Sequence, residues 1–66
     1  MGKRIVERSK LRIFNVWGRL VHSEMLDVVG LENFVWDGKD QGGNDCMKKT
    51  VYFAQYEAKQ WKISLW

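Results

Sequence analysis

The sequence has 66 residues, a net charge of +3 and an aromatic content of 14%. A chain of this length buries only about 60% of the surface that its unfolded form exposes, so its stability is marginal unless a further interaction stabilises the fold. Its one cysteine and one histidine exclude an intramolecular disulfide and a four-ligand Cys/His zinc site built from a single chain. The remaining sources of stability are a dense aromatic core and the association of two copies, so a homodimer is one of the expected states.

The N-terminal segment is basic and lacks the features of a membrane signal. Arg8, Lys10 and Arg12 interrupt any apolar region of the kind found in signal peptides, and no run of 18 apolar residues occurs in the sequence. We therefore expect a cytoplasmic protein with no membrane partner. Residues 1–9 are interpreted as a flexible basic arm, within which residues 5–6 could add a short edge strand.

Residues 10–29 fit two different structures. Most of their apolar side chains fall within one half of a helical wheel, Ser9 stands at the N-cap position, and Gly30 follows the last apolar turn. This pattern predicts a helix over 10–29. However, residues 13–18 are poor helix formers, and Gly18 would cost about 1 kcal/mol inside a helix. The alternative is a strand over 11–21, followed by a short helix over 24–29 that Ser23 caps and Gly30 ends.

The second half of the sequence predicts a strand, a polar loop and a hairpin. Residues 31–36 favour a strand, and residues 37–45 form a polar loop with three glycines and no apolar side chain. Residues 49–56 and 60–66 predict a hairpin, since residues 61–65 alternate between apolar and polar side chains. The turn near residues 57–59 lacks glycine and asparagine, which favours a type I connection of four residues or more.

These elements predict a single α+β domain over residues 1–66. Its architecture would be a three- to four-stranded antiparallel sheet with one amphipathic helix packed on a face. The alternative, if residues 11–21 form a strand, is a small all-β curled sheet or open barrel.

The sequence contains no arrangement of residues that predicts catalysis. Nothing in the spacing of His22 and Cys46 places them together as a nucleophile and its base. The polar loop does not fit a calcium-binding loop, because Lys39 and Gln41 occupy ligand positions and no glutamate stands twelfth. We therefore expect no enzyme activity, no cofactor and no catalytic or metal site.

The distribution of charge favours a binding function. Residues 1–12 carry five basic side chains and one acidic side chain, and residues 47–66 carry four basic and one acidic. The middle of the sequence, residues 13–46, carries two basic and six acidic side chains. The leading interpretation is a non-catalytic protein-interaction module, that is, a small inhibitor, adaptor or regulatory subunit that binds a larger protein. The candidate partner-binding residues are Arg4, Arg8, Arg12, Lys39, Asp40, Lys48, Lys49 and Trp66.

The alternative interpretation is a small basic nucleic-acid-binding protein. Its arginines and lysines would contact phosphates, and Tyr52, Tyr56 or Trp66 would stack on unpaired bases. Whether the two basic ends of the sequence form one patch depends on the fold, so the sequence alone leaves this point open.

Overall fold

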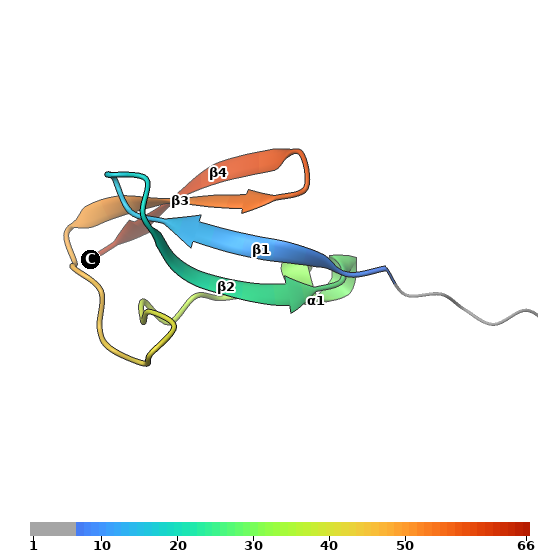
Figure 1. Ribbon diagram of the computed structural model, residues 1–66, viewed down its shortest axis with the longest axis horizontal. Coiled ribbons are helices and arrows are strands. Elements are labelled where there is room, and N and C mark those ends of the chain that lie inside the picture. The colour runs from blue at the N-terminus through green and yellow to red at the C-terminus, as the bar shows by residue number, and fades with distance from the viewer. Residues whose placement is uncertain (1–6) are drawn as a thin grey trace, which may run out of the picture.

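Four antiparallel strands and one short helix make up residues 7–66, the part of the chain that the structure, a computed structural model, describes. In chain order these are β1 (Ser9–Phe14), β2 (Leu20–Leu26), α1 (Val28–Glu32), β3 (Thr50–Tyr56) and β4 (Lys59–Leu65) (Figure 1). The strands form one open sheet in the order β2-β1-β3-β4. A four-stranded antiparallel sheet with one helix is thus confirmed. Arg4 and the strand expected at residues 5–6 lie outside the described residues.

The helix predicted over 10–29 is wrong, because this segment folds as the β1–β2 hairpin up to Leu26 and α1 begins only at Val28. Leu11 pairs with Glu24 and Ile13 with His22, and the register shifts before Phe14. The turn between the strands has a local cause. The Asn15 side chain accepts hydrogen bonds from the backbone N–H groups of Trp17 and Arg19, at 3.0 and 2.9 Å. Gly18 adopts φ +80°, a conformation that is strained for residues with a Cβ atom but not for glycine.

The helix α1 is shorter than either prediction and begins later. Asp27, not Ser23, caps it by accepting a hydrogen bond from the Gly30 N–H at 2.7 Å, and Gly30 lies inside the helix. The strand predicted over 31–36 is also wrong, since Leu31 belongs to the helix and Phe34 donates its N–H to the Leu31 carbonyl. With five residues, α1 cannot cover the sheet as the predicted long helix would.

The hairpin predicted at the end of the sequence is confirmed as β3 and β4. Its connection is shorter than expected, because Tyr56 pairs with Lys59 and only Glu57 and Ala58 lie between them. Glu57 has φ +54°, at the first central position of a two-residue turn, where type II′ turns usually have glycine. The turn therefore forms despite an unfavourable residue, which the pairing along both strands holds in place.

We expect Glu57→Gly to stabilise the protein by about 1 kcal/mol, because glycine removes the cost of a left-handed conformation at this position. Urea denaturation followed by tryptophan fluorescence would show the midpoint moving upward. Ala58→Gly is the matched control, since Ala58 has no positive φ and the change only adds freedom to the unfolded chain. A lower midpoint for Glu57→Gly than for the wild type would contradict this account of the turn.

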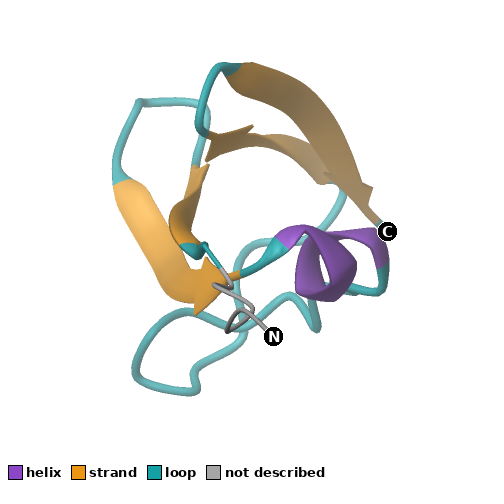
Figure 2. Ribbon diagram, turned by 90° about the vertical axis from the view of Figure 1, so that its right-hand side faces the viewer, coloured by secondary structure: helices purple, strands orange, loops and turns teal. Residues whose placement is uncertain are grey.

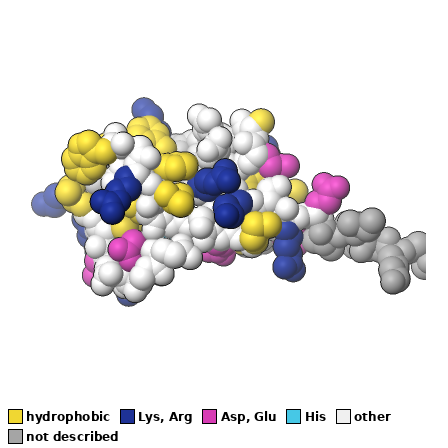
Figure 3. Space-filling view, in the orientation of Figure 1, with side chains coloured by type: hydrophobic (Ala, Val, Ile, Leu, Met, Phe, Trp, Pro, Cys, Tyr) yellow, Lys and Arg dark blue, Asp and Glu magenta, His cyan; other side chains and the backbone are white. Residues whose placement is uncertain are grey.

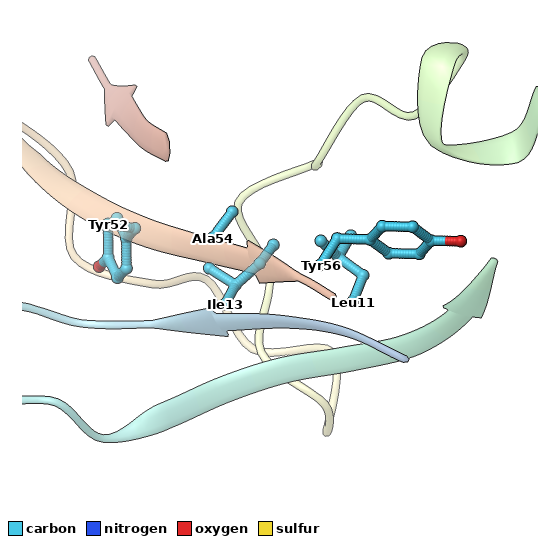
Figure 4. Packing of buried hydrophobic residues seen from close by; sticks show 5 residues of the cluster. All are labelled: Leu11, Ile13, Tyr52, Ala54 and Tyr56. Atoms are coloured by element: carbon cyan, nitrogen blue, oxygen red, sulfur yellow. The ribbon is translucent and has the colours of Figure 1, made fainter. Parts of the chain in front are cut away.

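The core lies on one face of the sheet, between β1 and β3 (Figure 4). Leu11 and Ile13 from β1 are fully buried beside Tyr52, Ala54 and Tyr56 from β3. Each tyrosine hydroxyl donates a hydrogen bond to a backbone carbonyl, Tyr52 to Met47 at 2.7 Å and Tyr56 to Leu26 at 2.8 Å. This core face is called the inner face below.

The segment from β2 to β3 supplies much of the remaining packing against this core. Half-buried apolar residues around the five core residues come from the strands and from this connection; they are Val21, Leu26, Leu31, Phe34, Trp36, Cys46, Ile63 and Leu65. Figure 2 shows the curved sheet with α1 and the connecting loops on its concave side. The opposite side of the sheet is called the outer face.

Candidate binding surfaces

The two edges of the sheet differ in what covers them. At the β2 edge, the backbone N–H of Gln41 donates to the Val21 carbonyl at 2.9 Å. The side-chain oxygen of Gln41 also accepts the N–H of Ser23 at 2.9 Å. A residue of the polar loop thus occupies backbone groups of β2 that a further strand would use, which is a known way to protect an edge.

The polar loop is ordered by its own hydrogen bonds. The Asp40 carboxylate accepts from the N–H groups of Gly42 and Asn44, at 3.0 and 2.9 Å, and the Asp40 N–H donates to the Asn44 carbonyl at 2.8 Å. Gly43 provides the positive φ, +85°, that the turn requires. The loop therefore presents Gln41 to β2 in a fixed position, and the carboxylate of Asp40, a predicted partner-binding group, is used within the loop.

The β4 edge has no such cover. β4 pairs with β3 through seven residue pairs, and within residues 7–66 no segment pairs with its other side. The outward backbone groups of β4 are therefore available to a further strand. Among the described residues, this edge has no hydrogen-bonded cover along its length, whereas Gln41 covers the β2 edge at Val21 and Ser23.

An apolar groove runs beside the open edge on the inner face. The alternation of β4 places Trp61, Ile63 and Leu65 along one wall, and residues of the β2–β3 connection form the other. The groove has a volume of about 470 Å³, and its second wall consists of Leu31, Phe34, Val35 and Trp36. Val35 is 87% exposed and Trp61 is 36% exposed, so the core is incompletely covered along β4.

Basic side chains lie along the same strand. Lys59 and Lys62 belong to β4, which contains no acidic residue. At the far end of the strand, the backbone N–H of Lys49 donates to the Leu65 carbonyl at 2.7 Å. β4 itself therefore contributes only positive charge to the open edge, which favours an acidic partner segment.

The structure brings only part of the predicted partner-binding set together. Lys48, Lys49 and Trp66 lie at the end of the sheet where β3 begins and β4 ends, and Trp66 is 84% exposed. Arg8 is exposed at the opposite end, just before β1. Arg8 and the lysine pair therefore do not form one basic patch.

Of three other predicted residues, Asp40 lies near that lysine end, where it lines one hollow with Met47 and Thr50. Arg12 is exposed on the outer face of β1. Lys39 forms an isolated backbone β-bridge with Asp45 across the polar loop, and the carboxylate of Asp40 accepts hydrogen bonds within that loop. The sequence did not point to Trp61 and Ile63 as binding residues. Their alternation with polar residues predicts a buried face, and only the strand order shows that this face ends at an open edge.

The residues considered for catalysis have structural partners. The His22 Nε2 atom lies 3.0 Å from the Glu24 carboxylate, and its ring stacks on Phe34 with 6.4 Å between centroids. Burial, together with the negative charge of Asp40, raises the pKa of the Cys46 thiol above its ordinary value of 9.0. Within residues 7–66, no group of three or more His, Cys, Asp or Glu side chains could hold a metal ion.

The chain matches no known protein family, no curated protein and no solved structure. Across the described residues, no helix has both the length and the apolar character needed to cross a membrane.

Proposed function

We propose that the protein is a non-catalytic interaction module that binds an extended segment of a larger protein along the open edge of β4. The observation that carries this proposal is the difference between the two edges, since Gln41 bonds to Val21 and Ser23 of β2 while β4 is uncovered beside an apolar groove. An added strand gains affinity from main-chain hydrogen bonds and specificity from pockets for alternate side chains. Both elements are present at β4.

The chemistry of the edge defines the segment that would bind. Alternate side chains of an added strand point to opposite faces, so every second residue would enter the groove beside Trp61 and Ile63. These residues should be apolar. The intervening residues would lie near Lys62 on the outer face and should include aspartate or glutamate. A small inhibitor, adaptor or regulatory subunit would use such an edge to occupy part of its target.

A phage-displayed library of random linear peptides, selected on the whole protein, tests the proposal. Alternating apolar and acidic peptides should be enriched, and their binding should perturb the amide NMR signals of Trp61 to Leu65. Val35→Glu places a charge in the groove wall at a residue that is 87% exposed, so folding should be unaffected. We expect this variant to bind the selected peptides at least tenfold more weakly, about 1.4 kcal/mol.

The matched control is Val29→Glu, which adds the same charge on α1 at a residue that is 65% exposed and does not line the groove. It should bind the peptides like the wild type. The proposal is overturned if no peptide is enriched, or if both variants bind equally well. It is also overturned if light scattering shows a dimer that Val35→Glu dissociates, because a second copy would then occupy the edge.

A further inference from the structure

The outer face of the sheet carries two phenylalanines side by side. Phe14 of β1 and Phe53 of β3 are register partners, so their Cβ atoms lie about 4.5–5.5 Å apart on the same face. Both alternate with buried residues of the core, Ile13 on one strand and Tyr52 and Ala54 on the other. Phe53 is nevertheless 39% exposed. The aromatic pair therefore faces away from the core and presents ring surface to solvent.

Basic and amide side chains surround this pair in two parallel rows. The first row runs Phe14–Phe53–Lys62 across three strands, and the second runs Arg12–Gln55–Gln60 beside it. Residues two apart on a strand are separated by about 6.8 Å, so the two rows are neighbours. Five of these six side chains, all except Arg12, line one shallow surface hollow of about 400 Å³.

The strands contribute charge of a single sign to this face. Its titratable side chains on the strands are Lys10, Arg12 and Lys62, all basic and exposed. Glu24 is the register partner of Leu11 and therefore lies on the inner face. On the side of the sheet away from α1, Figure 3 shows Lys and Arg side chains next to hydrophobic ones. An anionic ligand with flat apolar groups would complement both features.

We propose that this outer face binds single-stranded nucleic acid, with unpaired bases stacked on Phe14 and Phe53 and phosphates held by Arg12 and Lys62. Stacking on aromatic side chains needs bases that are free of a partner strand, which excludes a continuous duplex as the preferred ligand. Gln55 and Gln60 can donate or accept hydrogen bonds at base edges. The sequence offered Tyr52 and Tyr56 for stacking, but both are buried, each 3% exposed.

The proposal concerns the face opposite the peptide groove and shares only Lys62 with the function proposed for the β4 edge. A protein partner is the competing occupant of any exposed apolar surface. The strand side chains on this face that carry charge are all basic, which favours nucleic acid, because no carboxylate among them would repel a phosphate chain.

Fluorescence anisotropy with labelled oligothymidylate and oligouridylate, compared with a mixed-sequence duplex, tests the proposal. The single strands should bind more tightly than the duplex. If Lys10 contacts the phosphates together with Arg12 and Lys62, the affinity should fall about 20-fold between about 50 mM and about 200 mM salt. Phe53→Ala should weaken single-strand binding at least about fivefold, since stacking on one aromatic ring contributes that much or more.

Two lysines of β4 give a matched pair for the charge. Lys62→Ala removes a charge on the outer face, whereas Lys59→Ala removes one beside Tyr56 on the inner face. Both side chains are exposed, so neither change should affect folding. Lys62→Ala should weaken binding and flatten its salt dependence, and Lys59→Ala should leave both near the wild-type values.

Several results would overturn the proposal. These are the absence of single-strand binding at low salt, equal or tighter binding of the duplex, equal losses for the two lysine variants, or unchanged binding by folded Phe53→Ala. If oligonucleotides fail and Phe53→Ala instead abolishes capture of the selected peptides, the outer face binds protein. Val35→Glu should not change oligonucleotide binding, so the two proposals can fail separately.

Discussion

Ile13→Ala should lower the free energy of unfolding by about 3 kcal/mol, because it leaves a cavity at a fully buried position between β1 and β3. A protein of this length has a total stability of about 3–10 kcal/mol, so the change removes a large share of it. Urea denaturation would show a much lower midpoint. The melting temperature should fall by roughly 12–24 °C.

Two controls separate the cavity from other effects of substitution. Ile13→Val removes a single methylene and should cost only about 0.5–1.5 kcal/mol. Arg12→Ala changes the adjacent exposed residue of the same strand and should stay within about 0.5 kcal/mol of the wild type. If Ile13→Ala costs no more than Ile13→Val, the core does not lie where β1 and β3 pair.

The β3–β4 hairpin could be predicted because its signal is local. Strict alternation over residues 61–65 suits a strand and does not suit a helix, and the structure has β4 there. The polar loop could be predicted for the same reason, from its glycines and polar residues. Its role could not, because the contact of Gln41 with Val21 and Ser23 joins segments far apart in the sequence.

Residues 10–29 were mispredicted because their apolar residues satisfy both a helical and an extended pattern. The helical wheel grouped Leu11, Ile13 and Phe14 on one side, but in β1 the first two face the core and the third faces outward. Pairing with β3 decides between the two patterns, and that pairing depends on residues about 40 positions later in the chain. The start of the short helix is instead set locally, by the Asp27 cap that directly follows β2.

The candidate sites depend even more on such distant pairing. Tyr52 and Phe53 are adjacent aromatic residues that the sequence does not distinguish, yet one is buried in the core and the other is exposed on the outer face. Likewise, Trp61 borders an open edge only because β4 is last in the strand order. Residue types alone did not define the candidate surfaces, and strand order determines which residues are exposed on them.

Trp36→Ala should lower the free energy of unfolding by about 3 kcal/mol and release the polar loop from the core. The indole ring packs edge-on against Tyr52, with 4.9 Å between centroids and 70° between planes. Its Nε1–H donates to the Lys39 carbonyl at 3.0 Å, which fixes the start of the loop. Trp36→Phe should cost less, about 1–2 kcal/mol, because the ring contact remains while the hydrogen bond is lost. Trp17→Ala is the exposed control, since Trp17 is 75% exposed.

The same substitution tests whether the loop protects β2. The Ser23 amide donates to the Gln41 side chain, so its hydrogen exchange should accelerate in Trp36→Ala much more than that of amides between β1 and β3. An uncovered β2 would give the sheet two open edges, and light scattering should then show association that increases with concentration. If the Ser23 amide stays protected in Trp36→Ala and light scattering gives the same mass as for the wild type, the hydrogen bonds around Asp40 suffice to hold Gln41 on β2. In that case Trp36 stabilises the core without controlling which edge is open.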